Sequence, residues 1–506
     1  MVSIDAFGNE TTVNTLVDRP SHTTTQTTLS PDSTLPAEVV VQSGLTISTR
    51  TPTGVATTYA YDALGRIASL SIITNDSSNI QTFQHSNIQT FTYSYLPGTD
   101  IVDGYTCGNF SRKIEFEPLR NLVAAVTNSY ANRVISAFDY TSDAAGRRTA
   151  ISRSGEAFGN LSGATDSYGY NSRNEVISAR RTKNGEIIHG FNEDFEYDPI
   201  GNRIWSTTCN ELGEPKTSQY SANNLNQYTS RTVPGYAAVR GHADADATVT
   251  VNEKPTYRYG EYFFGSDEFD NSQFAVEAEL ITSAVLASPT NGLDEVCSVT
   301  SRVHIPKATQ HFSYDLDGNL STDGYYTFTY DSNNRLKTVS TNGVLVLTNF
   351  YDEKSRRVRK ITTESAISFY YDDWNLVEEH VAYTNGAMST IHYSWGTDLS
   401  GALYGAGGVG GLLYLTVDDE IYIPCYDNTY NNIPVRTPTG EIVYRGGFNL
   451  HTGRASDGCV TVWSDVSQGD KGYPHSDDYD RLKDFLNKTK PLRYKNSNYT
   501  GWLVVK

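Results

Sequence analysis

The sequence predicts a mainly β protein in which repeated β-hairpins wind into a spiralling shell, followed by a small C-terminal β-rich domain with one short helix. The chain has 506 residues and contains 35 Tyr and 19 Phe but only 2 Met. Aromatic and β-branched residues favour strands over helices. A Tyr-Asp pattern also recurs along most of the chain, and in its densest part the pairs lie 16, 21 and 20 residues apart. This is the spacing of successive hairpins.

The repeat reads aromatic, any residue, Tyr-Asp, two to four residues rich in Gly or Asn, then Arg, Asn or Leu and a β-branched residue. Each copy predicts a strand, a turn in which Asp or Asn bonds its own backbone, and a second strand. Stacked hairpins bury one face against their neighbours, so we expect the repeated tyrosines to be structural. The clear copies begin at Tyr59, Phe195, Phe312, Phe328, Phe350 and Phe369, and weaker ones lie at Asp5, Asp143, Tyr170, Tyr220 and Tyr426.

These motifs resemble those of the Rhs, or YD-repeat, proteins of bacteria, which are related to the YD shell of teneurins. The resemblance runs from the first residues to about position 432. It implies a hollow β-shell with a variable C-terminal domain, often a toxin, and an immunity protein as a partner. The chain opens inside a repeat and lacks the Rhs-associated core that carries the family's Asp-Pro-x-Gly self-cleavage motif. Its only Asp-Pro, Asp198-Pro199, lies within a repeat. Autoproteolysis is therefore not expected.

The repeats divide the chain into four regions. Residues 1–232 and 312–432 are predicted to form the shell, and residues 233–311 interrupt the pattern as an inserted β-rich module. A structural insert and a carbohydrate-binding module both remain open for this region. Residues 433–506 form the C-terminal domain, in which 477–488 reads as a short amphipathic helix.

Composition excludes several classes of partner. The 40 basic and 58 acidic side chains give a net charge of -18, which repels phosphates and anionic lipids, so no nucleic acid partner is expected. No apolar run approaches the roughly 20 residues of a membrane span. The first residues lack a signal peptide, so we expect secretion or surface display through a dedicated secretion system.

No cofactor or metal is expected. The five Cys show no CxxC pair and no zinc-ligand spacing. The glycine-rich run 405–410 precedes a strand-like segment rather than the helix that a dinucleotide site needs. Asp315 to Asn319 offers alternating oxygens but lacks the glycine and the final carboxylate of a calcium loop.

The chemistry-bearing candidates lie near the C-terminus. His451 and Cys459 stand at the two ends of a short glycine-rich loop between two strand-like segments. A thiol becomes a strong nucleophile when a neighbouring base favours the thiolate. If the loop folds back, His451 could activate Cys459, and the N–H groups of Gly458 and Cys459 could hold an oxyanion. Ser456 could bond the loop or orient the histidine. The alternative is a buried free cysteine beside an unrelated surface histidine.

The segments 448–453 and 456–460 resemble the signature of L,D-transpeptidases of the YkuD type, and more closely that of small secreted antibacterial effectors. This resemblance implies that Cys459 is the nucleophile and His451 the base, acting on peptide bonds in peptidoglycan stem peptides. Asp457 stands where these enzymes have a second histidine, and it either stabilises the His451 imidazolium or caps the turn.

Two functions follow. The first is a fragment of an Rhs-type polymorphic toxin whose C-terminal cysteine domain cleaves or exchanges peptidoglycan peptide bonds during competition between bacteria. The alternative is a non-catalytic YD-repeat protein, with a surface, interaction or carbohydrate-binding role and an inactive C-terminal remnant.

Overall fold

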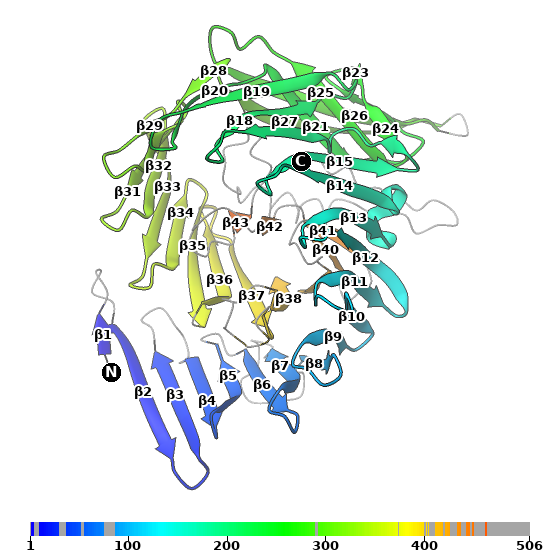
Figure 1. Ribbon diagram of the computed structural model, residues 1–506. Helices are drawn as coiled ribbons and strands as arrows, with labels where there is room; N and C mark the ends of the chain where they lie inside the picture. Colours follow the sequence, from blue (N-terminus) through cyan, green and yellow to red (C-terminus); the bar gives the residue numbers. More distant parts are fainter. Residues whose placement is uncertain are drawn as a thin grey trace.

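The computed structural model is almost entirely antiparallel β-sheet, which confirms the predicted fold class. It describes residues 2–4, 10–29, 37–51, 55–74, 87–288, 292–372, 374–398, 401, 403, 410–417, 420–425, 433–436, 442–445, 448–449 and 461–462. Two large sheets follow each other around a ring (Figure 1). The segment expected to be helical, 477–488, lies outside the described residues.

The first sheet is a meander of 21 strands among the described residues. Successive strands pair with each other, except that β15 pairs with both β16 and β17, and that β20 pairs with β28 across the insert. Its strands are β1 (Val2–Ile4), β2 (Glu10–Asp18), β3 (Thr23–Leu29), β4 (Ala37–Gln42), β5 (Leu45–Arg50), β6 (Ala56–Tyr61), β7 (Ile67–Thr74), β8 (Asn87–Tyr95), β9 (Val102–Cys107), β10 (Phe110–Phe116), β11 (Val123–Tyr130), β12 (Arg133–Ser142), β13 (Arg148–Ser154), β14 (Ala164–Tyr170), β15 (Val176–Lys183), β16 (Glu186–Ile187), β17 (Glu193–Tyr197), β18 (Arg203–Cys209), β19 (Pro215–Ala222), β20 (Tyr228–Thr232) and β28 (Thr309–His311).

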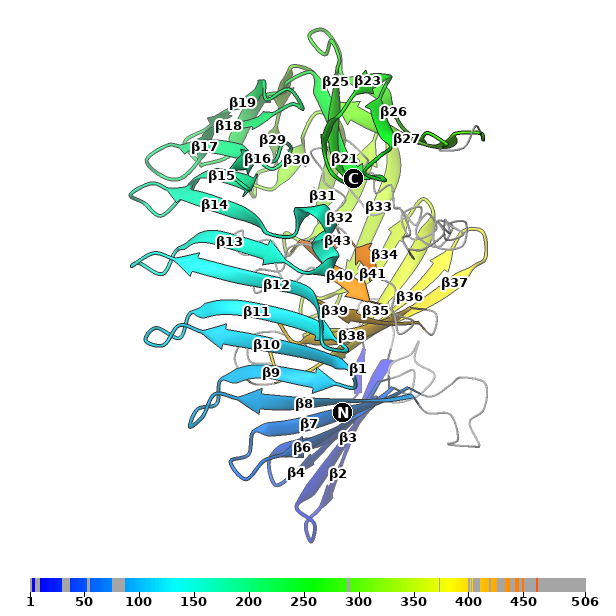
Figure 2. The same ribbon diagram turned by 90° about the vertical axis from the view of Figure 1, so that its right-hand side faces the viewer.

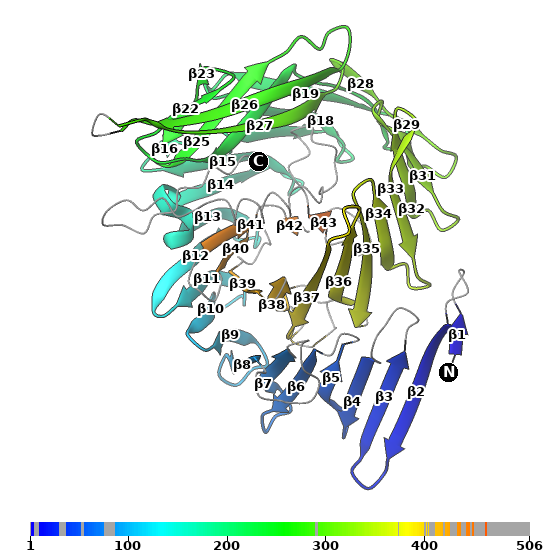
Figure 3. The same cartoon turned by 180° about the vertical axis from the view of Figure 1, so that it is seen from behind.

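The second sheet continues the meander with 13 described strands, and its last members turn into the ring (Figures 1 and 3). These strands are β29 (Ser313–Tyr314), β30 (Leu320–Thr322), β31 (Tyr326–Tyr330), β32 (Leu336–Thr341), β33 (Val344–Tyr351), β34 (Arg357–Thr362), β35 (Ser365–Asp372), β36 (Asn375–Tyr383), β37 (Met388–Trp395), β38 (Leu412–Val417), β39 (Glu420–Pro424), β40 (Ile433–Arg436) and β41 (Ile442–Arg445). A separate pair, β42 (Phe448–Asn449) and β43 (Thr461–Val462), follows.

The repeat turns share one geometry, which explains the Tyr-Asp pattern. In the turn after β6, Asp62 Oδ1 accepts the backbone N–H groups of Leu64 and Arg66, and Asp62 Oδ2 accepts the Arg66 side chain at 2.7 Å. Gly65 has φ +79°, a conformation that favours glycine. The backbone N–H of Arg66 is the first cause that holds the pKa of Asp62 below its usual range. One carboxylate therefore closes this hairpin.

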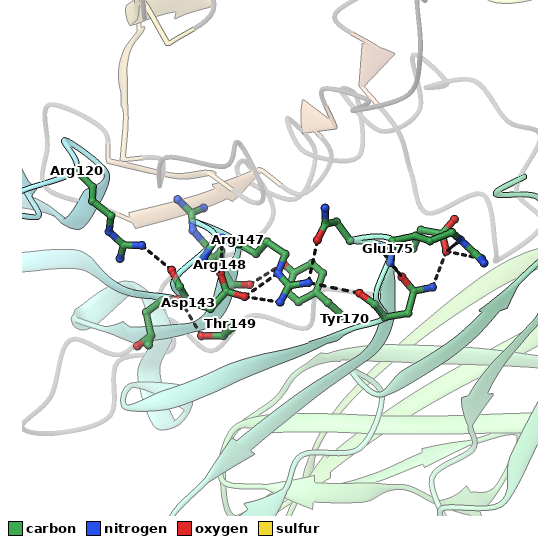
Figure 4. A network of polar contacts seen from close by, with 12 residues as sticks. Arg120, Asp143, Arg147, Arg148, Thr149, Tyr170 and Glu175 are labelled. Atoms are coloured by element: carbon green, nitrogen blue, oxygen red, sulfur yellow. Dashed lines mark hydrogen bonds and ion pairs between the residues drawn. The ribbon is translucent and has the colours of Figure 1, made fainter. Parts of the chain in front are cut away.

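The arginine of one repeat turn contacts the repeat tyrosine of the next hairpin, and this links neighbouring turns. Arg147, bound to Asp143, lies over the ring of Tyr170 in the next hairpin, with 5.0 Å from Cζ to the ring centroid. The Tyr170 hydroxyl donates to the carbonyl of Arg148 at 2.6 Å (Figure 4). Other repeat tyrosines also donate to a preceding hairpin's carbonyl, namely Tyr61, Tyr95, Tyr314, Tyr330, Tyr351 and Tyr371. The tyrosines are therefore structural, as expected.

Asparagine replaces arginine in two turns and makes a shorter version of the same link. Asn202 donates both to Asp198 in its own turn and to Asn226 in the next, at 2.9 and 3.2 Å. Asn319 does the same with Asp315 and Asn334, at 3.0 Å each. Asp315 Oδ1 also accepts two backbone N–H groups of its own turn. The segment that superficially matched a calcium loop is thus a repeat turn.

The insert forms two small sheets of its own beside the wall strands β14 to β19 (Figures 2 and 3). β25, in the centre, pairs with β21 and β24, and β22, β23, β26 and β27 form the other sheet. The strands are β21 (Tyr236–His242), β22 (Thr248–Val251), β23 (Lys254–Pro255), β24 (Tyr257–Tyr259), β25 (Tyr262–Glu268), β26 (Val276–Leu286) and β27 (Glu295–Ile305). A 3-10 helix, η2 (Glu156–Leu161), follows β13 in the shell wall. Figure 2 shows the stacked wall strands beside this module.

Candidate functional site

The residues predicted to carry chemistry, His451, Ser456, Asp457, Gly458 and Cys459, lie outside the described residues. The two short strands that flank them are described. β42 and β43 pair antiparallel, with Phe448 opposite Val462 and Asn449 opposite Thr461. The two strands therefore run beside each other in opposite directions. In sequence, His451 is two residues after one paired position and Cys459 two residues before the other.

These strands lie inside the ring, where the second sheet ends. β38 to β41 curve inward from β37, and β42 and β43 lie in the middle of the ring in both the front and back views (Figures 1 and 3). The strands β1 to β20 and β28 to β36 surround them. The part of the chain that the sequence analysis singled out is thus flanked by strands that face the inner side of the wall.

A buried seam joins the inward-turning strands to the first sheet. Tyr414 of β38 stacks on Phe91 of β8, with ring centroids 6.0 Å apart and planes 8° from parallel. Both side chains are almost fully buried, in a cluster that also contains Leu413 and Cys425. The backbone N–H of Thr397 lies 3.4 Å from the Tyr93 hydroxyl. This seam fixes where the C-terminal strands begin.

A glycine makes this close approach feasible. A Cβ added at Gly396 would overlap the Tyr93 hydroxyl and would lie 2.9 Å from Leu413 Cδ1. Gly396 also donates its N–H to the Gly411 carbonyl at 2.7 Å. The seam therefore has no space for a side chain at position 396, because the Gly396 backbone lies directly against the Tyr93 and Leu413 side chains.

Polar side chains continue the seam across three wall strands. Arg112 on β10 donates to Asn128 Oδ1 at 3.0 Å, and Asn128 on β11 donates to Ser136 Oγ at 3.0 Å. Ser136 on β12 donates to the carbonyl of Cys425 at 3.3 Å. All four residues are buried. Buried polar groups need hydrogen-bond partners, so this row anchors the chain just after β39.

A second buried polar group lies on β36 and β37. Glu378 has no exposed surface, and its carboxylate oxygens lie 3.4 Å from His380 Nε2 and 3.5 Å from His392 Nδ1. Nearby on β34, Lys360 is buried, and burial lowers its pKa to about 8. Sequence reasoning missed these groups, because alternation in a strand gives no sign of which polar side chains face inward. Within the described part of the chain, no group of three or more His, Cys, Asp or Glu could hold a metal ion.

The insert contacts the shell through a buried cluster, in which Leu161 and Ile188 of the shell pack with Ala238 of the insert, and through aromatic and polar contacts. His189 stacks on Tyr257 with centroids 4.4 Å apart, and the Tyr262 hydroxyl donates to the His189 carbonyl at 2.9 Å. A shallow depression at this junction is lined by residues that include Lys216, Tyr236 and Phe269. A carbohydrate partner for the insert stays a proposal. Over the described residues, no helix is long and apolar enough to cross a membrane.

Comparison with known proteins gives partial similarities. No family model matches the chain. It is 28% identical over 134 residues to a tRNA3(Ser)-specific nuclease WapA of Bacillus spizizenii, covering 26% of this chain and 5% of that protein. It is 31% identical over 88 residues to a tRNA nuclease WapA of Bacillus subtilis strain 168, covering 17% and 4%. The chain thus spans a small part of these relatives.

Two solved structures show a looser likeness over most of the chain. A crystal structure of TcdB2-TccC3-TEV has 12% identity and a TM-score of 0.38, covering 88% of this chain and 23% of that one. The Photorhabdus luminescens Tc holotoxin pore with a TccC3 D651A mutation has 12% identity and a TM-score of 0.41, covering 89% and 22%.

Proposed function

We propose that this chain is the shell part of an Rhs-type polymorphic toxin, which holds a C-terminal cysteine domain on the inner side of its wall. The observation that carries the proposal is the buried seam of Tyr414 and Phe91, reinforced by the hydrogen bond from Ser136 to the Cys425 carbonyl. A seam of this kind directs the following residues inward. The resemblance of the repeats to YD-repeat proteins supports the same role.

The C-terminal chemistry we propose is acyl transfer through Cys459. His451 takes the proton of the thiol, and the thiolate attacks the carbonyl carbon of a peptide bond in a peptidoglycan stem peptide. The N–H groups of Gly458 and Cys459 would hold the oxyanion. The imidazolium then protonates the leaving amine, and water or another amine resolves the thioester. Ser456 and Asp457 would position the loop and His451. No cofactor is required.

The pairing of β42 with β43 supports this proposal. Opposed residues in an antiparallel pair have Cβ atoms roughly 4.5–5.5 Å apart. His451 and Cys459 are equally distant from the paired positions Asn449 and Thr461. A hairpin that kept this register for two further residues would bring them opposite each other.

The test is expression of the full chain, with an export signal, in the periplasm of a Gram-negative host. Muropeptides are then analysed by mass spectrometry, beside a Cys459→Ala chain produced at the same level. We expect shortened or exchanged stem peptides only with Cys459 present, and His451→Ala should abolish them as well. Identical muropeptide profiles for wild type and Cys459→Ala would exclude this chemistry. An immunity protein, if it exists, should bind both forms.

A nuclease is the second candidate, and two observations favour it. The curated relatives are named as tRNA nucleases. Residues 433–506 also contain 11 Lys and Arg against 8 Asp and Glu, whereas residues 1–432 contain 29 against 50. A basic C-terminal region is suited to phosphate contacts, in contrast to the acidic shell.

Cytoplasmic expression separates the two candidates. A nuclease predicts loss of intact tRNA, read by gel and sequencing, from the full chain without an export signal. The peptidoglycan enzyme predicts intact tRNA in that compartment and damage in the periplasm alone. Absence of both effects would favour the non-catalytic alternative, a surface or interaction protein with an inactive C-terminal remnant.

A further inference from the structure

The outer strand of the insert is long and regular. β26 and β27 pair over 11 residues each without a bulge, from Val276 opposite Ile305 to Leu286 opposite Glu295. Within its sheet, β27 is the outermost strand, because the order is β23, β22, β26, β27. Figures 1 and 3 show this hairpin reaching out from the side of the ring.

The first half of β27 is exposed, and after Glu295 it carries no charged residue until Arg302. Residues 295–298 are all exposed, and Val296 keeps 65% of its surface. The stretch Val296 to Ser301 contains no charged residue and no Pro. Natural sheets usually protect such an edge with Lys, Pro, a bulge or a covering segment, because its free N–H and C=O groups can pair with another strand.

The two faces of this strand differ. Cys297, Val299 and Val303 share a face with Leu280 and Ala284 of β26, which belong to the core of the insert. Val303 is buried, but Cys297 at the outer end is exposed. The apolar face of the sheet is therefore incomplete at its open edge.

We propose that this edge pairs with the same edge of a second copy of the chain. A two-fold axis perpendicular to an antiparallel sheet leaves side chains on their own face, so one residue must lie opposite its own copy. With Ser298 at the centre, Cys297 pairs with Val299 of the partner subunit. The apolar face then continues from one copy into the other.

Charge pattern selects this register and this occupant. In it, Asp294 lies opposite Arg302 of the partner subunit, and the pair occurs twice by symmetry. The Arg302 side chain is 85% exposed and contacts Glu279 at 3.1 Å. In this register, no two residues of like charge lie opposite each other between Asp294 and Arg302. The net charge of -18 on each chain opposes the approach of two copies at other surfaces.

The first test is sedimentation of the full chain under reducing conditions over a range of concentrations. We expect a dimer in the micromolar range that Val299→Lys weakens at least about tenfold, because two ammonium groups would enter the apolar face. Phe274→Lys, at a site 79% exposed in the same module but off the edge, is the matched control and should have no effect. A chain that stays monomeric, or a dimer that ignores Val299→Lys, overturns the proposal.

Register is tested by cross-linking and charge exchange. Diagonal neighbours across a strand pair are about 7–8 Å apart, so a short bismaleimide should join Cys297 to Cys297 of the partner subunit, and Cys297→Ser should remove this product. Arg302→Asp should weaken the dimer roughly tenfold, and adding Asp294→Arg should restore it. A dimer without the Cys297 cross-link, or without rescue, contradicts this pairing.

Discussion

The repeat turns, which form the rim of the shell, and the buried seam inside the shell stabilise the fold through different kinds of contact. On the rim, each Asp–Arg–Tyr link is partly exposed and recurs from hairpin to hairpin, as between Asp143, Arg147 and Tyr170. In the seam, Tyr414 and Phe91 form a buried contact between segments more than 300 residues apart. Repetition therefore fixes the register of the wall in many small steps, whereas one cluster fixes the position of the C-terminal strands.

The largest effect is expected from Tyr414→Ala. Removing a fully buried aromatic side chain should cost about 3–5 kcal/mol, from lost burial and the cavity left behind. Urea unfolding monitored by fluorescence and circular dichroism measures it. Leu64→Ala is the control, since Leu64 is 73% exposed on a rim turn and should change stability little. Equal effects of the two variants would contradict the distinction between seam and rim.

Asn128→Ala should have the next largest effect. It removes an acceptor of the buried Arg112 guanidinium and a donor to Ser136, which should destabilise the shell by about 1–3 kcal/mol. The same unfolding experiment applies, with Asn333→Ala in an exposed turn as the control. If Asn128→Ala proves neutral, the polar row does not anchor the chain at Cys425.

On the rim, Arg147→Lys should cost only about 0.5–1 kcal/mol. Lysine keeps the charge beside Asp143 but loses the planar stacking over Tyr170. Arg133→Lys, at a side chain that is 62% exposed, should change the melting temperature still less. A loss as large as that of Tyr414→Ala would mean that single turns, rather than their repetition, control stability.

Acid should loosen the rim before the seam. The Arg147 side chain is the first cause that lowers the pKa of Asp143, and the Arg66 backbone N–H is the first for Asp62. A carboxylate with a lowered folded pKa stabilises above its unfolded value and loses this contribution as pH falls through the folded pKa. Hydrogen exchange should therefore rise in the turns below about pH 4, while the amides of β38 remain protected. Simultaneous loss in both regions would refute this order.

The sequence was sufficient for the hairpins because their turn chemistry is local. Asp, Gly and Arg within five residues determine the geometry at Asp62. The same reasoning missed the turn at Asn210, which has no Tyr-Asp pair. There the Asn210 amide oxygen accepts the backbone N–H of Glu214, and the Asn210 amide nitrogen donates to the Glu214 carboxylate. It could not find the seam, since nothing local at Tyr93 indicates that Thr397 will lie against it. The roles of His451 and Cys459 stay predictions.

The central claim is that the chain after the seam runs inside the ring, and timed trypsin digestion of the intact protein tests it most directly. Arg436 and Arg445 end the inner strands β40 and β41, whereas Arg173 lies in a repeat turn with a 43% exposed side chain. We expect cleavage after both inner arginines to be much slower than after Arg173, and the difference to vanish in denaturant. Equal rates in the native protein would contradict the account.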